Sequence, residues 1–256
     1  MPAAISIKAD EPWLRPTLVA SWREIVLVIL LLIGPAAWHS ACAAWMGSSS
    51  HYISLLLTDS RMWSTGAKEG VMLAFFLVFL HWRGWKPADF RIQIGFWSSL
   101  QGLPLVLAMT LANLVTVSST FFLLFKLQSK YAHFLPFVAA SNGQVATMHD
   151  VVISWFPMIS AMILNAFFEE LICMGYIFNQ LAMRLGPALA LFITVLLRMS
   201  CHTYQGGVHV LGIGVVFLIS GLWYWRTRNL WTLIFAHALL DIGMAAAVKL
   251  VFSHHH

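Results

Sequence analysis

The sequence has little charge for its length, and this scarcity is the first constraint on the kind of protein it encodes. Asp, Glu, Lys and Arg make up only 10% of its 256 residues, whereas soluble domains carry about 25%. Hydrophobic residues account for 60% of the chain. Because a water-soluble fold cannot bury that much apolar surface, the composition excludes an ordinary soluble domain and indicates an integral membrane protein.

Cysteine is also scarce, and its arrangement argues against two kinds of site. The three cysteines, Cys42, Cys173 and Cys201, are odd in number and show no CxxC spacing. Neither a disulfide framework nor a thiolate zinc site is therefore expected. The HExxH pattern of many zinc proteases is absent as well. We interpret the cysteines as buried, reduced thiols.

A concentrated basic surface is missing too, although the net charge is +5. Lys and Arg lie scattered near the ends of apolar runs and form no stripe, so nucleic acid is not an expected partner. The partner expected from composition is the lipid bilayer. More Lys and Arg lie in the connections on the N-terminal side than on the other side, which predicts a cytoplasmic N-terminus in a bacterial cytoplasmic membrane.

What the sequence has in abundance is long apolar runs. A helix needs about 20 apolar residues to cross the hydrocarbon core of a bilayer. Runs of this kind occur at 25–45, 68–84, 98–125, 151–183, 187–203, 207–225 and 230–250. The sequence therefore predicts an all-α, polytopic bundle of about seven transmembrane helices, with a range of about six to eight.

The runs fall into two regions. A polar N-terminal segment, 1–24, precedes an N-terminal transmembrane region, 25–150, whose last part, 128–150, is predicted as an extramembrane loop. A second transmembrane domain follows at 151–250. The tail, 251–256, ends in three histidines and resembles the remnant of a purification tag, so it is not interpreted as a metal site.

Ionisable side chains inside the later runs are the strongest functional signal, because such residues are costly in a membrane and mark functional sites. Residues four apart share one face of a helix. The relevant residues form an adjacent pair and two such i, i+4 pairs: Glu169 and Glu170, Arg198 and His202, and His237 and Asp241. We expect three helices to bring them together in one buried cluster.

Peptide bond hydrolysis gives this set of residues a coherent use. The reaction needs a base that activates water, an acid for the leaving amine and donors for the oxyanion. Glu169 with His202 can serve the first two roles. His237, oriented by Asp241, can donate to the developing oxyanion.

Three sequence segments also resemble the motifs of a known family. FEELICMGY at 168–176, RMSCHTYQG at 198–206 and HALLD at 237–241 resemble the EExxxR, FxxxH and HxxxN/D motifs of the CPBP or Abi family, the type II CAAX prenyl protease and bacteriocin-processing proteins. The resemblance covers roughly residues 150–245. It implies an intramembrane glutamate endopeptidase without a cofactor, which cleaves a membrane-proximal peptide; a prenylated CAAX-like tail is one candidate. The implied catalytic residues are Glu169, His202, His237 and Asp241, with Glu170 in a supporting role.

Two positions depart from these motifs. Met174 stands where the first motif has Arg, and Arg198 stands where the second often has Phe. We hypothesise that Arg198, reaching across from the neighbouring helix, supplies the positive charge that Met174 lacks. Asp241 replaces the Asn of the third motif, and an ionised Asp only accepts hydrogen bonds, so orienting His237 is its expected role.

Other functions stay open at this point. A zinc-dependent membrane hydrolase would use Glu169, His202 and His237 as ligands around an open position for water. A catalytically silent relative would act as an immunity or scaffold protein in the membrane, and Met174 keeps this alternative open. A proton-coupled carrier would also need buried acids and histidines, but the sequence shows no inverted repeat.

Overall fold

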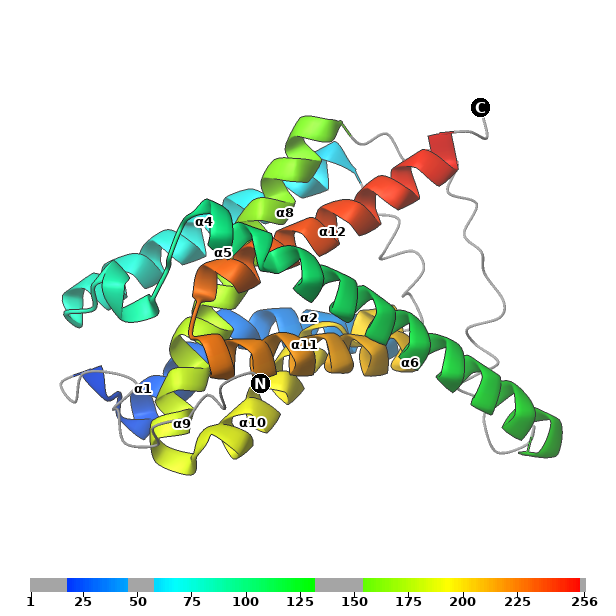
Figure 1. Ribbon diagram of the computed structural model, residues 1–256, viewed down its shortest axis with the longest axis horizontal. Helices are drawn as coiled ribbons and strands as arrows, with labels where there is room; N and C mark the ends of the chain where they lie inside the picture. Colours follow the sequence, from blue (N-terminus) through cyan, green and yellow to red (C-terminus); the bar gives the residue numbers. More distant parts are fainter. Residues whose placement is uncertain (1–17, 46–57, 132–153, 254–256) are drawn as a thin grey trace, which may run out of the picture.

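The computed structural model describes residues 18–45, 58–131 and 154–253 (Figure 1). Within these ranges the chain is helical and contains no strand. The elements in order are α1 (Trp22–Val28), η2 (Ile29–Ile33), α2 (Gly34–Trp45), α4 (Asp59–Trp82), η3 (Pro87–Phe90), α5 (Phe96–Leu100), α6 (Gly102–Tyr131), α8 (Trp155–Glu170), η5 (Leu171–Phe178), α9 (Asn179–Leu185), α10 (Pro187–Cys201), η6 (Thr203–Gln205), α11 (Gly207–Thr227) and α12 (Leu230–Ser253).

The prediction of a polytopic helical bundle is confirmed. Among the described residues, six helices are long and apolar enough to cross a membrane, and the shorter α10 is apolar as well. All seven predicted runs coincide with these helices. α1, η2 and α2 together form the first span, and α8, η5 and α9 together form the fourth.

Some predicted boundaries were wrong. α4 begins at Asp59 instead of residue 68, because its first turns carry polar residues that interrupt the apolar pattern. α6 continues to Tyr131, so the first residues of the predicted loop 128–150 are helical, and the rest of that segment lies outside the described residues. Residues 251–253 of the predicted tail still belong to α12, while the N-terminal residues 1–17 and the terminal histidines 254–256 also lie outside.

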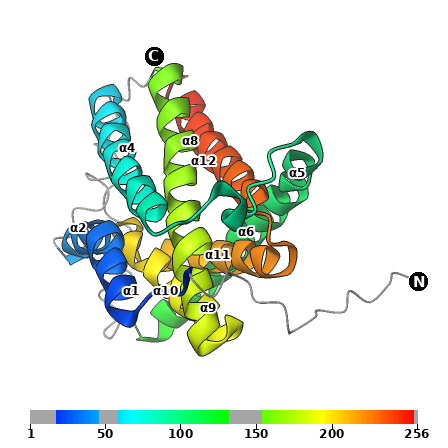
Figure 2. The same ribbon diagram turned by 90° about the vertical axis from the view of Figure 1, so that its left-hand side faces the viewer.

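The helices pack in two groups that enclose the candidate site. α8 lies between α4 and α12, and these three helices run side by side (Figures 1 and 2). α10 packs against α2 and α11 in the second group. α6 contacts α11 and α12 and thereby joins the groups. The continuous helix of α8, η5 and α9 runs from the first group into the second and links them through the core (Figure 2).

Two spans contain a π-helical segment, and each has a local cause or consequence. In the first span the Gly34 N–H bonds to the carbonyl of Ile29, five residues back, and Pro35 follows without an N–H to donate. In the fourth span the π-helical segment η5 begins directly after Glu169 and Glu170. Such segments are often found at functional sites, because they change the direction of side chains within a helix.

A buried amide ties the start of the described chain to this central helix. The Gln180 side chain accepts a hydrogen bond from the Ala20 N–H at 2.7 Å and donates one to the Leu18 carbonyl at 3.0 Å. Arg184 donates a further bond to the Ala20 carbonyl. Because Gln180 is completely buried, these bonds satisfy backbone groups that would otherwise be costly in an apolar core.

Candidate active site

A buried ion cluster lies where α8, α10 and α12 meet. The Arg198 Nη2 atom is 2.6 Å from Glu170 Oε1 and 3.3 Å from Glu169 Oε2. The face of the guanidinium group rests on the Phe217 ring of α11, 3.7 Å from its centroid. The hypothesised contact of Arg198 with both glutamates is therefore present, and a cation from α10 faces the acids that Met174, on their own helix, cannot neutralise.

His237 of α12 joins this cluster to a third acid. Its Nδ1 atom lies 2.9 Å from Glu170 Oε1, and its Nε2 atom lies 3.4 Å from Asp241 Oδ2. Asn165 of α8 donates to the same Asp241 oxygen at 3.3 Å. Both nitrogens of the imidazole thus face carboxylates, and His237 is buried. The i, i+4 pairing predicted for His237 and Asp241 holds in the structure.

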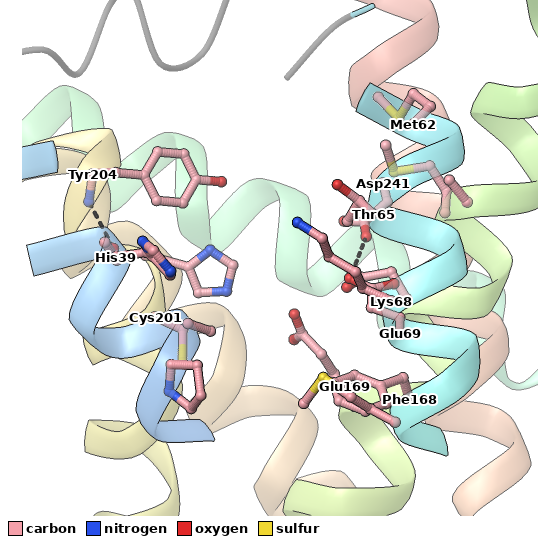
Figure 3. A pocket seen from close by; sticks show the side chains of 18 of the residues that line it. His39, Met62, Thr65, Lys68, Glu69, Phe168, Glu169, Cys201, Tyr204 and Asp241 are labelled. Atoms are coloured by element: carbon pink, nitrogen blue, oxygen red, sulfur yellow. Dashed lines mark hydrogen bonds between the residues drawn. The ribbon is translucent and has the colours of Figure 1, made fainter. Parts of the chain in front are cut away.

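A cavity of about 590 Å³ adjoins the ion cluster, within the usual size range of roughly 300–1,000 Å³ for ligand pockets. Glu169, His202 and Asp241 line it. Figure 3 shows Glu69, Glu169 and Asp241 on one side of this space and His39, Cys201 and Tyr204 on the other. Glu170, Arg198 and His237 are not among the lining residues, so they lie behind the cavity wall.

His202 reaches the cavity from a turn at the end of α10. It is the C-cap of that helix, and η6 follows with Gly206 as its own C-cap, whose φ of 88° favours glycine. The Gln205 amide lies 3.4 Å from the His202 Nδ1 atom. The Nε2 atom is buried and has no hydrogen-bond partner in the part of the chain that the structure describes. An imidazole with one unpaired nitrogen has the capacity to exchange a proton with a bound molecule.

Sequence reasoning missed the contribution of the N-terminal region to this cavity. α4 supplies a row of lining residues at i, i+3, i+7 and i+10, the spacing of one helix face: Met62, Thr65, Glu69 and Met72. Lys68 from the same helix and His39 from α2 also line the cavity. The spacing was a usable signal, but the predicted start of this span at residue 68 cut the row in two.

The geometry of the site also bears on the three cysteines and on the alternative of a zinc site. All three cysteines are free thiols; Cys173 is buried, and Cys201 lines the cavity. In the described ranges no group of three or more His, Cys, Asp or Glu side chains is arranged to hold a metal ion. The zinc alternative, with Glu169, His202 and His237 as ligands, stays an untested prediction.

Comparison with known protein families agrees with the three motifs. Residues 151–243 match the type II CAAX prenyl endopeptidase Rce1-like family. This match confirms the resemblance to CAAX proteases, and we call 151–243 the Rce1-like segment. It contains all six residues of the three predicted pairs. A search of curated proteins and a search of solved structures each found no match. The Rce1-like segment and the apolar helices together support a membrane protein of a protease family.

Proposed function

We propose that the protein is an integral membrane endopeptidase in which Glu169 and His202 activate a water molecule for attack on a peptide bond. The observation that carries this proposal is that both residues, from α8 and from the end of α10, line one cavity inside the Rce1-like segment. Glu169 also lies beside Arg198, so its carboxylate has a charged donor on the side away from the cavity. A base, a histidine and space for a substrate are thereby combined.

The remaining residues of the site hold Glu169 and Asp241 in position. Arg198 bonds both glutamates, and Glu170 bonds Arg198 and His237. His237 in turn contacts Asp241, whose carboxylate lines the cavity. This chain of contacts orients the Glu169 and Asp241 carboxylates from behind. The role of His237 as an oxyanion donor stays a prediction, because its two nitrogens face Glu170 and Asp241 in this arrangement.

The proposed substrate is a peptide or protein tail at the membrane, and a prenylated CAAX-like tail is one member of this class. The cavity wall supports this proposal because it combines polar groups with apolar side chains from several helices, such as Leu32, Met72, Met162 and Met244. An apolar wall favours apolar peptide side chains or an attached lipid. Following the charge of the connecting segments, we also propose that the N-terminus is cytoplasmic in a bacterial membrane.

Variants of the two proposed catalytic residues test this function directly. Purified protein in detergent or lipid should cleave a fluorogenic CAAX-like peptide, with and without a prenyl group. Glu169→Gln and His202→Ala should each lower kcat/KM by about 10²–10⁴-fold, the range for loss of a general acid or base. His209→Ala is the matched control, because His209 is exposed and does not line the cavity; it should keep full activity.

The outcomes separate the competing functions. A biological phenotype that survives both Glu169→Gln and His202→Ala would show that proteolysis is not the function and would favour a silent immunity or scaffold protein. Stoichiometric zinc in the purified protein, together with loss of activity on chelation, would favour the zinc hydrolase. We propose that activity needs no cofactor, so chelation should leave the cleavage rate unchanged.

A further inference from the structure

One acid in the cavity has no role in the reaction as proposed so far. Glu69 lies on α4, far outside the Rce1-like segment, yet it lines the same cavity as Glu169, His202 and Asp241. Figure 3 shows its side chain on the same side of the cavity as Glu169. An ionisable residue within a membrane span is expensive and is by default a functional residue.

Glu69 differs from the other acids of the site in its hydrogen bonds. Glu170 receives one bond from Arg198 and faces His237, Glu169 receives one from Arg198, and Asp241 receives one from Asn165. Glu170 Oε2 and Glu69 Oε2 are both buried without a hydrogen-bond partner in the described ranges, but Glu170 is held through its Oε1 atom. Among the described residues, no ion pair or side-chain hydrogen bond joins Glu69 to a partner, the adjacent Lys68 included.

A missing donor has a chemical consequence for a carboxyl group. An ionised carboxylate only accepts hydrogen bonds, and burying it without donors is costly. A protonated carboxylic acid carries no charge and has a donor of its own, so burying it without a neighbouring donor costs less free energy. Of the four acids, Glu69 is therefore the one whose surroundings suit a carboxyl group that holds a proton and gives it up during a reaction.

We propose that Glu69 is the general acid of this site and donates a proton to the leaving amine; this proposal rests on the proposed endopeptidase function. Glu169 takes a proton from water while the water oxygen bonds to the peptide carbonyl carbon. When the carbon–nitrogen bond breaks, its electron pair stays on nitrogen, which takes the proton from Glu69. The products are a carboxylic acid and an amine. Passage of the proton from Glu169 to Glu69 through water in the cavity then restores both groups.

A pair of substrates that differ only in the leaving group tests this role. The first is a cleavable peptide, and the second is its thioester analogue, in which sulfur replaces the N–H of the scissile bond. A thiolate leaves without being protonated, whereas an amine cannot. Glu69→Gln should therefore lower kcat/KM for the peptide by about 10²-fold or more, the effect of losing a general acid, and change the thioester rate only a few-fold.

Three further variants serve as controls for the peptide and thioester rates of Glu69→Gln. Thr65→Val alters the same face of α4 one turn away and should change both rates by the same small factor. Glu169→Gln should abolish cleavage of both substrates, because both need activated water. Glu69→Asp keeps a carboxyl group and should retain part of the peptide activity. If Glu69→Gln does not yield folded protein, as judged by its elution and melting temperature in detergent, the peptide and thioester rates of Glu69→Asp are compared instead.

The possible failures can be told apart. Equal losses on the peptide and the thioester in Glu69→Gln would overturn the general-acid role and leave Glu69 as a structural residue. Unchanged rates on both substrates would overturn it too. A wild-type protein that cleaves neither substrate would instead refute the proposed function itself.

Discussion

The Rce1-like segment and the region before it differ most in how much of their transmembrane spans is buried inside the protein. In the most apolar part of the Trp155–Leu185 span, 67% of the residues are buried inside the protein. The corresponding share is 22%, 17% and 11% in the three earlier spans. Most of the central helix of the Rce1-like segment is thus buried, while the earlier spans bury few of their residues and present a largely apolar surface to lipid.

The two regions also contribute different parts of the site. The ion cluster of Glu169, Glu170, Arg198 and His237 is built entirely within the Rce1-like segment. The cavity is not, because α2 and α4 supply part of its wall. The segment that matches the family therefore holds the reactive groups in place, and the preceding region encloses the space in which they would act.

The largest expected effect comes from removing the cation of the ion cluster. Arg198→Phe would leave Glu169 and Glu170 without their charged partner. Breaking a buried ion pair from one side costs roughly 3–5 kcal/mol, and activity should fall with the orientation of Glu169. Melting temperature in detergent and peptide cleavage should both drop sharply.

A second substitution turns this loss into a test of the motif. Met174→Arg combined with Arg198→Phe recreates the EExxxR and FxxxH pattern, with the cation moved to the helix of the glutamates. We expect this double variant to recover part of the stability and activity lost in Arg198→Phe alone. Met174→Arg in the wild-type background is the control and should be destabilising, because it adds a second buried cation. An equal defect in the single and double Arg198 variants would show that the charge cannot be supplied from position 174.

An intermediate effect is expected where the two regions pack closely. A Cβ atom added to Gly212 of α11 would overlap Asn113 Oδ1 and lie 2.7 Å from Val117 Cγ2 of α6. Gly212→Ala should therefore push these helices apart and cost about 1–3 kcal/mol, as overpacking does. Gly243→Ala is the matched control, since no atom of another described element lies within 4 Å of its added Cβ. A melting temperature of Gly212→Ala equal to that of Gly243→Ala would contradict close packing of α6 on α11.

The smallest effect is expected at a partly exposed contact between the regions. Arg83 at the end of α4 bonds Glu24 at 3.1 Å, and Tyr176 of the Rce1-like segment donates to the same Glu24 oxygen at 2.6 Å. Partly exposed ion pairs contribute about 0–1 kcal/mol. Arg83→Met should lower the melting temperature only slightly, and Tyr176→Phe should lower it more, because Tyr176 is fully buried. The reverse order would mean that the ion pair is the stronger link.

Much of the fold followed from local patterns, and the errors have local causes as well. The apolar runs marked all seven helices, because an apolar run of this length has few other stable states in a bilayer. The start of α4 was missed because its first turns carry Asp59 and Arg61, which interrupt the apolar pattern. The i, i+4 pairs located Arg198, His202, His237 and Asp241, since side-chain directions on a helix follow from its period. Glu69 lay near the start of the predicted run 68–84 but belonged to none of the three pairs, so it was not selected.

The sequence by itself determined the membrane class, the helical spans and the residues that are too costly to bury without a role. It does so because hydrophobicity and helical period are properties of short stretches of chain. Only the tertiary structure decided which of these residues meet. It placed Arg198 against both glutamates, turned His237 between Glu170 and Asp241, and brought Glu69 of α4 to the cavity of α8 and α10. Contacts of this kind depend on how distant helices pack, which no local pattern specifies.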